Sequence, residues 1–436
     1  MLSRRTIVKA IPGMAATTGI VAPWIMTRSG LAGASAKAND TIGVGVIGLG
    51  IRGRRLMAQL LQRDDIRIVG VCDVAGPRLI RGMRDVQQHA GEPCAAYLEF
   101  RDLLSRPDID AVIIATPDHQ HAFESIHATA MGKHVYCEKP MTLTIPEGRA
   151  VAKAVSRAGT TFQTGSQQRS EYGHRFVTAC EHVHNGRIGR LQRIEVGVAQ
   201  PPASCDLPDQ DTPAGYDWDR WLGQAPQRGF HSDLCPIGVH GHYPTWRAWR
   251  EYGNGYLADM GAHHFDIAQW GMQADDSGPI RITPPTVAQD GTMPQDGLEL
   301  EYADGVVVSH GGRSGCTFYG TDGWIWVDRG TVEASDEAIL KDPRGAGQAE
   351  LPRHAGHMAN WVDCMRSGQT PICPAEVGHR TASVNQLAVL GYELGEPLSW
   401  DPTAERFVGE SATHNPSLHR PVRDGWQVPG VSTATT

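Results

Sequence analysis

The chain has 436 residues, of which 40% are hydrophobic and 20% charged, and its formal net charge at pH 7 is −8. This length allows two or three domains with large cores, and the composition is ordinary for a soluble globular protein. An acidic chain with no basic stripe interleaved with aromatic residues is not expected to bind nucleic acid. Beyond residue 36, no apolar run is long enough to span a bilayer.

The first 36 residues differ from the rest because they contain basic side chains and no acidic ones. Residues 3–9 (SRRTIVK) match a twin-arginine export signal, a modest apolar stretch follows over residues 10–26, and Ala34-Ser35-Ala36 suits a signal peptidase. The alternative is a disordered basic N-terminus. We expect residues 1–36 to be a twin-arginine (Tat) signal peptide, with the Tat export machinery as a partner, the periplasm as destination, and no membrane span after processing.

A glycine-rich turn follows the first expected strand, residues 41–47, and precedes a helix expected from Arg54 to Leu61. The pattern Gly-x-Gly-x-x-Gly at this position is typical of dinucleotide binding. Its first glycine makes a tight turn, its second lets the backbone approach a pyrophosphate, and its third lets the helix pack against the strand. The helix N-terminus offers free N–H groups to the phosphates. The predicted cofactor-binding residues of this turn are Gly48, Leu49, Gly50, Ile51, Arg52 and Gly53.

The next expected strand, Ile66 to Cys72, ends at Asp73, which lies 20 residues beyond Gly53. A carboxylate at this place binds the ribose hydroxyls of the adenosine half and repels a 2′-phosphate, so it favours NAD over NADP. Arg78 lies nearby and could accommodate a 2′-phosphate, so NADP is the less favoured alternative. The alternative interpretation is a structural glycine-rich turn in another kind of α/β protein.

Two more short apolar strands are expected over residues 111–116 and 133–138, with a helix from Ala122 to Met131 between them. This alternation predicts a doubly wound parallel sheet, which binds ligands at the carboxyl ends of its strands. Asp73, Thr116 and Glu138-Lys139-Pro140 then lie on one edge. A lysine there can bond a substrate hydroxyl and stabilise the alkoxide-like charge of its oxidation. The alternative for Lys139 is a solvated side chain in a surface turn.

After about residue 160 the expected strands become longer and alternate in polarity, at 191–200, 298–302, 306–310 and 324–327. This pattern predicts an α+β domain with an open, largely antiparallel sheet. The Pro-, Gly-, Trp- and His-rich segment 201–252 is expected to form an ordered excursion over the cleft. The predicted domains are therefore a Rossmann domain at 37–160, a substrate and oligomerisation domain at 161–410, and a C-terminal tail at 411–436.

A second group of chemically active side chains lies in residues 253–270. A helix starting near Asp259 puts Asp259 and His263 on one face. A carboxylate beside an imidazole orients the ring and supports a general base whose pKa is near neutral. His264 and Asp266 point elsewhere and serve substrate binding or helix packing.

A metal site is the competing interpretation of the histidines, and zinc or iron suits the ligand set His240, His242, His263, His264 and Asp266. With 19 histidines in the chain, chance clustering is expected, so we predict no metal and structural roles for the loop pair. The nine cysteines are scattered and odd in number, so they do not form a disulfide scaffold. Cys205 and Cys235 flank part of a loop-rich segment, and we expect them to stay unpaired.

Four motifs in this order resemble the Gfo/Idh/MocA oxidoreductase family over nearly the whole chain after residue 36. They are Gly48-x-Gly50-x-x-Gly53, Thr116-Pro117-Asp118-His119-Gln120-His121, Glu138-Lys139-Pro140 and Asp259-x-Gly261-x-His263-x-x-Asp266. The resemblance implies that Lys139, Asp259 and His263 are catalytic. It also implies that the nicotinamide half is lined by Thr116, Pro117, His121, Glu138 and Lys139. Substrate contacts are expected from Gln167, Arg169 and His264, and the family's second domain implies a homo-oligomer.

The expected function is hydride transfer between NAD and a secondary alcohol of a sugar, sugar acid or cyclitol. One alternative is a redox-cycling glycosidase or lyase with no net oxidation, since the family includes NAD-using glycosidases. Another is a non-catalytic sugar-binding protein on a dehydrogenase fold. The exported glucose–fructose oxidoreductase branch usually has tyrosine at the position of His263, so its particular activity is not implied. Free NAD is scarce outside the cytoplasm, so we expect a tightly bound cofactor.

Overall fold

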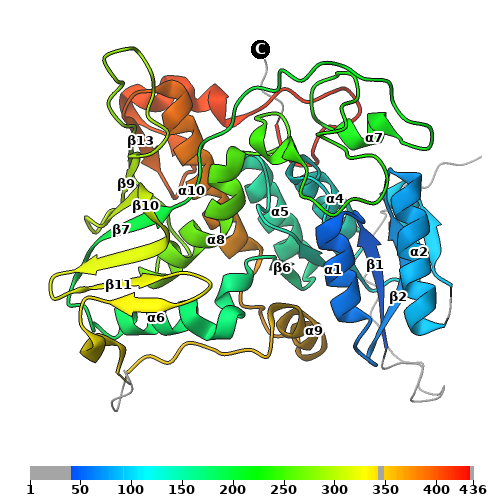
Figure 1. Ribbon diagram of the computed structural model, residues 1–436, viewed down its shortest axis with the longest axis horizontal. Coiled ribbons are helices and arrows are strands. Elements are labelled where there is room, and N and C mark those ends of the chain that lie inside the picture. The colour runs from blue at the N-terminus through cyan, green and yellow to red at the C-terminus, as the bar shows by residue number, and fades with distance from the viewer. Residues whose placement is uncertain (1–40, 92, 342–347, 433–436) are drawn as a thin grey trace, which may run out of the picture. The chain divides into compact units, whose positions relative to one another are not determined.

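The computed structural model describes residues 41–91, 93–341 and 348–432, drawn as coloured ribbon in Figure 1. The predicted signal peptide, with its twin arginines and its cleavage site at Ala36, lies outside these residues. Among them, no helix combines the length and the apolar character that a membrane crossing requires.

The N-terminal part is built on a six-stranded sheet with the order β3-β2-β1-β4-β5-β6, in which every pair is parallel. Its strands are β1 (Ile42–Ile47), β2 (Ile66–Cys72), β3 (Ala95–Tyr97), β4 (Ala111–Ile114), β5 (His134–Cys137) and β6 (Phe162–Thr164). The predicted doubly wound sheet is confirmed. The chain reverses its winding between β1 and β4, where sheets of this kind bind ligands. The sixth strand lies just beyond the predicted boundary at residue 160.

Helices cover both faces of this sheet: α1 (Ile51–Leu60), α2 (Gly76–Ala90), α3 (Phe100–Leu104), α4 (Asp118–Ala130) and α5 (Ile145–Ala158). Two of them begin earlier than predicted. Helix α1 starts at Ile51, inside the glycine turn, because Gly50 is its N-cap. Helix α4 starts at Asp118, directly after Pro117, whose φ is −62° and ψ 151°. Both helices therefore direct their N-termini toward the carboxyl edge of the sheet.

The C-terminal part is built on an eight-stranded antiparallel sheet with the order β12-β11-β10-β9-β8-β13-β14, in which β7 also pairs with β10. Its strands are β7 (Leu191–Gly197), β8 (Arg281–Thr283), β9 (Glu299–Glu301), β10 (Val307–Gly320), β11 (Trp324–Val327), β12 (Val332–Ala334), β13 (Leu398–Asp401) and β14 (Arg406–Phe407). Strand β10 is longer than predicted, because several register shifts let it follow β7 past a bend. The predicted antiparallel sheet is confirmed.

Helices α6 (Arg175–His184), α8 (Gly255–Gly271) and α10 (Ala375–Leu394) pack against the second sheet, and α8 contacts both α6 and α10. Short 3₁₀ turns η1 (Gln167–Arg169), η2 (Tyr172–His174) and η4 (Glu337–Leu340) link these layers. Helix α9 (His357–Ser367) returns to the first sheet, where Met358, Trp361 and Val362 join its core. Phe265 of α8 and Phe318 of β10 belong to the larger core of the second sheet. Helix α8 thus contributes to the core of the second sheet, and its Asp259 bonds to Lys139, which follows β5 of the first sheet.

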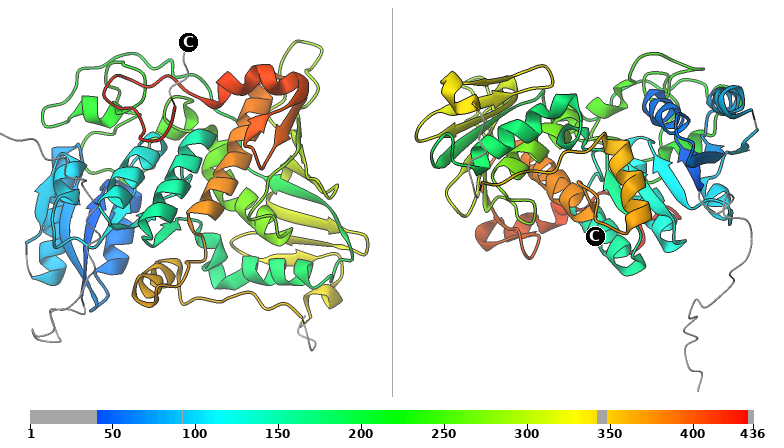
Figure 2. Two further views of the ribbon diagram at one scale, coloured as in Figure 1. Left: turned by 180° about the vertical axis from the view of Figure 1, so that it is seen from behind. Right: turned by 90° about the horizontal axis from the view of Figure 1, so that it is seen from below.

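The segment 201–252 is ordered, as its tryptophan content predicted. It contains α7 (Trp218–Leu222) and η3 (Thr245–Ala248), and it has a small core of its own around Trp218, Trp221 and Tyr252. Figures 1 and 2 show this segment, in green, passing over the edge of the sheet beside α1 and α2. It will be called the cover segment below.

The chain after residue 408 packs back onto the molecule. It forms η5 (Gly409–Leu418) and then runs beside the cover segment (Figures 1 and 2). Arg423 donates to the carbonyl oxygen of Gly223 at 2.8 Å, and the Trp426 ring lies 5.5 Å from Phe123. Val428 is buried in the core of the first sheet. The described part of the predicted tail therefore belongs to the fold.

Candidate active site

The glycine turn has the shape that a dinucleotide requires. Gly48 has φ of +86°, in the left-handed region, and makes the turn. A Cβ on Gly53 would lie 1.8 Å from the carbonyl oxygen of Gly48, so the helix packs on the turn only with glycine here. A Cβ on Gly50 would meet no protein atom within 4 Å, so that side of the turn faces open space. No side chain caps the N-terminus of α1, which leaves its N–H groups available to a phosphate.

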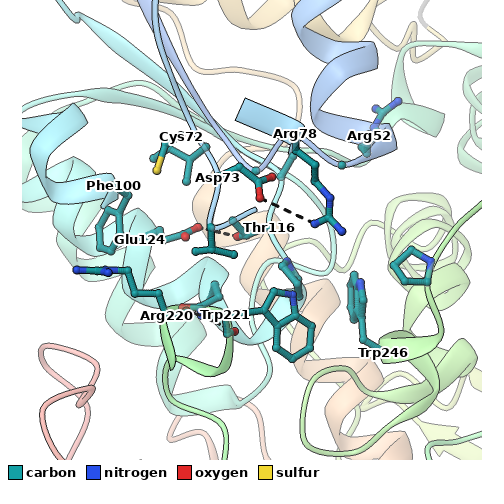
Figure 3. Close-up of a pocket in the computed structure, with 18 of the residues that line it drawn as sticks. Arg52, Cys72, Asp73, Arg78, Phe100, Thr116, Glu124, Arg220, Trp221 and Trp246 are labelled. Carbon is teal, nitrogen blue, oxygen red and sulfur yellow. Dashed lines mark hydrogen bonds and ion pairs between the residues drawn. The ribbon is translucent and has the colours of Figure 1, made fainter. Parts of the chain in front are cut away.

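The open space beside the turn is a cavity of about 110 Å³. Asp73 lines it at the end of β2 and is buried. Its carboxylate accepts hydrogen bonds from the backbone N–H of Leu49 at 2.7 Å and of Ala75 at 2.8 Å. The Arg78 guanidinium lies 3.9 Å away, as Figure 3 shows. Each carboxylate oxygen has a second lone pair, so Asp73 can still accept from a ribose hydroxyl.

The cover segment forms a roof over this cavity. It joins the chain after Asp73 through two backbone bonds, from Gly76 N–H to the Gly215 carbonyl oxygen and from Asp217 N–H to the Val74 carbonyl oxygen, each 2.9 Å. Arg78 also donates to the carbonyl oxygen of Pro236 at 2.6 Å. Further roof and wall residues are Arg220, Trp221, Leu234, His240, Trp246 and, from the chain end, Trp426.

Thr116 and the buried Glu124 are linked to each other at the inner wall. The hydroxyl of Thr116 donates to Glu124 at 2.6 Å (Figure 3). Burial raises the pKa of Glu124 to about 8, against the effect of that hydrogen bond. Glu124 is therefore mostly protonated at neutral pH, so this wall carries less negative charge than the sequence indicates. Pro117 and Gln120 line the cavity beside Thr116.

A second cavity, of about 380 Å³, adjoins the first. The two share Arg52, Thr116, Trp246 and Arg247 among their walls. The second cavity brings together eight of the predicted site residues from distant parts of the chain: Arg52, Thr116, His121, Glu138, Lys139, Gln167, Asp259 and His263. It will be called the substrate cavity.

Lys139 follows β5 and reaches across to α8. Its Nζ lies 2.6 Å from Oδ1 of Asp259 and 2.7 Å from the backbone oxygen of the same residue. Arg247 of the cover segment is the second cation on that carboxylate, with Nε 3.3 Å from Oδ1. Burial raises the pKa of Asp259, but the charges of Lys139 and Arg247 outweigh this effect and hold it below its ordinary value. The ammonium group of Lys139 is thus fixed at the wall of the substrate cavity.

His263 has different surroundings from those predicted. The Asp259 carboxylate bonds to Lys139 and Arg247, and the predicted orientation of the His263 ring by Asp259 is wrong. Helix α8 starts at Gly255, so both residues lie inside it. Burial, reinforced by the charges of Lys139 and Arg329, lowers the pKa of His263 well below 6.5. The predicted near-neutral pKa is therefore replaced by an imidazole that is uncharged at pH 7.

Glu138 connects the glycine turn to the substrate cavity. Its Oε1 accepts from Nε of Arg52 at 2.7 Å and from Nε2 of Gln167 at 3.0 Å. Arg52 belongs to the first turn of α1, beside the glycine turn. Its bond to Glu138 therefore links the first cavity to the residue that precedes Lys139 in the second. Gln167 lines the substrate cavity, as predicted from its segment.

His121 supports the backbone on both sides of the site. Its Nδ1 lies 2.7 Å from the carbonyl oxygen of Pro140, and its Nε2 lies 3.0 Å from that of Thr116. It is buried on α4 and lines the substrate cavity. The ring thereby ties the loop after β4 to the loop after β5.

Two predicted substrate contacts lie away from the cavity. Arg169 is buried and bonds to Asp266 at 2.8 Å and to Asp275 at 2.7 Å. Its guanidinium also lies 5.0 Å from the Trp270 ring centroid, so it joins η1 to α8 and not to a ligand. His264 is buried, with Nδ1 3.4 Å from Nε2 of Gln168. Both side chains stabilise the second domain.

The histidines of the alternative metal site do not converge. On the cover segment, Nδ1 of His240 bonds to the backbone oxygen of His242, while Asp266 pairs with Arg169. Within residues 41–91, 93–341 and 348–432 there is no group of three or more His, Cys, Asp or Glu side chains that could hold a metal ion. All nine cysteines, including Cys205 and Cys235, are free thiols.

Several cavity residues were not predicted from the sequence. Arg247, Trp246 and Tyr243 come from the cover segment, whose aromatic content indicated order but not which side chains face the site. Arg329 comes from the turn between β11 and β12, and no local pattern marks it.

Comparison with known proteins identifies both halves of the chain. Residues 42–166 match the family model for the Gfo/Idh/MocA oxidoreductase family, NAD-binding Rossmann fold. Residues 202–428 match the model for the C-terminal alpha/beta domain of the same family. An uncharacterized oxidoreductase, YrbE, of Bacillus subtilis is 30% identical over 379 residues, covering 82% of this chain and 96% of that protein.

Other similarities are partial or structural. A glycosyl hydrolase family 109 protein of Shewanella baltica is 31% identical over 189 residues, covering 42% of this chain and 41% of that protein. The alignments to the next such relatives cover 38% of their length, so the match to them is a partial one. The structure of an NAD-binding protein from Listeria innocua has a TM-score of 0.56 at 19% identity, covering 82% of this chain and 97% of that one. That likeness concerns the fold.

Proposed function

The chain belongs to the Gfo/Idh/MocA oxidoreductase family, and from this premise we propose that it transfers a hydride between NAD and a secondary alcohol of a sugar, sugar acid or cyclitol. The observation that carries the proposal is the position of Lys139, whose Nζ is held 2.6 Å from Asp259 in the cavity that adjoins the glycine turn. NAD, when bound, supplies the hydride acceptor or donor.

Lys139 acts on the oxygen of the reacting carbinol. Its ammonium group has three donors. Two of them are used by the carboxylate and the carbonyl oxygen of Asp259, which leaves one for a substrate oxygen. A fixed positive donor stabilises the negative charge that develops on this oxygen, and removing such a donor costs about 10²–10³ in rate.

His263 is the candidate base for the hydroxyl proton. Because burial keeps it uncharged, a ring nitrogen is free to accept a proton at neutral pH. Its Nδ1 is buried and has no hydrogen-bond partner in the part of the chain that the structure describes, so Nε2 is the ring nitrogen that would meet a substrate. In the reverse direction the protonated ring returns the proton to the carbonyl oxygen. Asp259 is a positioning residue for Lys139 in this scheme.

The residues around the first cavity fit a bound NAD. The open face of Gly50 and the uncapped α1 would accommodate the pyrophosphate, and Asp73 would accept a hydrogen bond from the adenosine ribose. The roof of the cover segment supports the idea that the cofactor is held tightly, because its exchange requires breaking the bonds at Gly76, Asp217 and Arg78. NAD is favoured over NADP since Arg78 is engaged by Pro236 and Asp73.

The first step is to identify the nucleotide by mass spectrometry of the purified protein. Sugars, sugar acids and cyclitols are then added while the absorbance at about 340 nm is recorded. A change in single-turnover mode supports the proposal. The absence of any change with every compound, while the nucleotide is present, would count against it. Ligand binding that His263→Ala leaves unaltered, with no turnover, would instead favour a non-catalytic sugar-binding protein.

A redox-cycling glycosidase is the second candidate, and the similarity to glycosyl hydrolase family 109 proteins favours it. The same lysine and histidine would serve oxidation of a ring hydroxyl, which acidifies the neighbouring C–H and permits elimination of the glycosidic group. Cleavage of an aryl glycoside without net formation of NADH would distinguish this activity. If aryl glycosides survive intact with bound NAD, it fails for those substrates.

Export by the twin-arginine route to the periplasm is also proposed, on the pattern of residues 3–9. Replacing both Arg4 and Arg5 by lysine should keep the protein in the cytoplasm, as fractionation and blotting would report. A homo-oligomer is proposed from the family alone, and light scattering would measure its mass.

A further inference from the structure

The substrate cavity has an excess of positive charge, although the chain as a whole has a net charge of −8. The cationic side chains that line it are Arg52, Arg55, Lys139, Arg247 and Arg329. The carboxyl side chains that line it are Asp118, Glu138 and Asp259. A pocket lined by one sign of charge attracts ligands of the opposite sign. The substrate cavity is therefore suited to an anion.

Ion pairs account for most of these charges but not for all. Glu138 pairs with Arg52 at 2.7 Å, and Asp259 serves both Lys139 and Arg247. Burial raises the pKa of Asp118 well above its ordinary value, which reduces the negative charge it contributes. Arg55 is an exposed residue at the rim. Lys139 and Arg247 thus share the single charge of Asp259, and among the described residues Arg329 forms no ion pair with a carboxylate.

The turn that carries Arg329 is fixed by its neighbour. Asp328 Oδ1 accepts from the backbone N–H of Gly330 at 2.7 Å and of Thr331 at 2.8 Å. The Asp328 N–H also donates to the carbonyl oxygen of Thr331 at 3.1 Å. Strands β11 and β12 on either side pair in register. The side chain thus projects from a defined backbone.

The guanidinium of Arg329 is itself oriented. Its Nε lies 3.2 Å from Oε1 of Gln168, whose Nε2 donates to the backbone oxygen of His263 at 3.2 Å. The guanidinium also lies 4.8 Å from the ring centroid of Tyr172. These contacts occupy Nε and one face of the guanidinium plane. Only the side-chain amide of Gln168 lies between the guanidinium and the backbone of His263. Among the described residues, no carboxylate lies within ion-pair distance of its two terminal nitrogens.

Building on the oxidoreductase function proposed above, we propose that the substrate is a sugar acid, and that the two terminal nitrogens of Arg329 bind its carboxylate. A planar guanidinium and a planar carboxylate form two parallel N–H···O bonds, which fixes orientation as well as affinity. The two free terminal nitrogens of Arg329 match the two oxygens of a carboxylate. A phosphate can also bond to a guanidinium, and a comparison of hexuronates with hexose 6-phosphates distinguishes the two ligands.

The test compares matched ligands that differ only in the acid group. The protein, purified with its nucleotide, is titrated calorimetrically with D-glucuronate, D-galacturonate and D-mannuronate, and with the corresponding hexoses and hexose 6-phosphates. The preferred hexuronate should bind about 10- to 100-fold more tightly than its hexose, the usual effect of hydrogen bonds to a charged group. Arg329→Met should reduce this ratio to about one while hexose binding is unchanged.

Two further variants protect the test against a folding defect. Arg329→Lys keeps the charge but not the two parallel bonds, so its ratio should lie between those of the parent and Arg329→Met. Arg190→Met removes an exposed arginine elsewhere in the same domain and should leave the ratio unaltered. If Arg329→Met loses binding of both ligands, the ratio in Arg329→Lys decides.

Three results would overturn the proposal: an equal ratio in the parent and Arg329→Met, no binding of any hexuronate, or tighter binding of a hexose 6-phosphate than of the hexuronate. The two proposals fail in different ways. A hexuronate preference without any absorbance change near about 340 nm would contradict the oxidoreductase function alone. Turnover of neutral sugars without that preference would contradict the sugar-acid assignment alone.

Discussion

The replacement of Gly50 by alanine separates cofactor binding from folding. Gly50 has φ of −63°, which alanine adopts without strain, and the added Cβ would meet no protein atom within 4 Å. The free energy of unfolding should therefore change by less than about 1 kcal/mol. The same methyl group would occupy the space through which a pyrophosphate approaches the backbone. We expect at least about a 100-fold loss of nucleotide affinity, or roughly 3 kcal/mol.

Two other glycines calibrate the result. A Cβ on Gly53 would lie 1.8 Å from a backbone oxygen, so Gly53→Ala should lower the free energy of unfolding by about 3 kcal/mol or more. A Cβ on Gly241 would also meet no protein atom within 4 Å, so Gly241→Ala should change neither property. Urea unfolding and the nucleotide content per chain, measured by mass spectrometry, are the two assays. A stably folded Gly50→Ala protein that retains a full complement of nucleotide would refute the reasoning.

Three further variants test the substrate cavity and its neighbour. Asp259→Asn releases Lys139 and should lower kcat/KM by about 10²-fold or more. The control Asp85→Asn removes a partly exposed ion pair and should leave kcat/KM unaltered. Equal kcat/KM in the two variants would contradict the positioning role of Asp259. The pKa of His263 is well below 6.5, so kcat/KM should fall only when the pH drops through that low value. A fall in kcat/KM centred between pH 6 and 7 would exclude His263 as the base. Glu124 has a pKa of about 8 in the fold against 4.5 ordinarily, so the stability of the parent falls as the pH rises between these values. Relative to the parent, Glu124→Gln should therefore gain about 3 kcal/mol between pH 5 and pH 8 in urea unfolding, and a pH-independent difference would argue against a buried protonated carboxyl.

The architecture followed from local patterns in the sequence. The strands of the first sheet are short, buried and apolar, and the glycine turn is defined by six consecutive residues, so both were predicted within a few residues. The alternating strands of the second sheet were also recognisable. The tryptophans of the cover segment predicted order, because burying Trp218 and Trp221 in a small core stabilises a long connection.

The partners of charged side chains were harder to predict, because they come from distant parts of the chain. Helical spacing placed Asp259 and His263 on one face of the helix. It contains no information about Lys139, which lies 120 residues before Asp259 and bonds to its carboxylate. Arg169 lies in a segment that lines the cavity, yet Asp266 and Asp275, about a hundred residues later, bind its guanidinium. Arg329 is an ordinary turn residue until the fold brings it beside Gln168.

The central claim is that Lys139 and His263 act on a hydroxyl beside a bound nicotinamide. The most direct measurement is rapid mixing of the nucleotide-loaded protein with hexuronates, sugars and cyclitols, followed by absorbance near about 340 nm over one turnover. We predict a change corresponding to one nicotinamide per active site in the parent, slowed by about 10²-fold or more in Lys139→Met. An unchanged spectrum with every compound, in a protein that demonstrably holds the nucleotide, would contradict the claim.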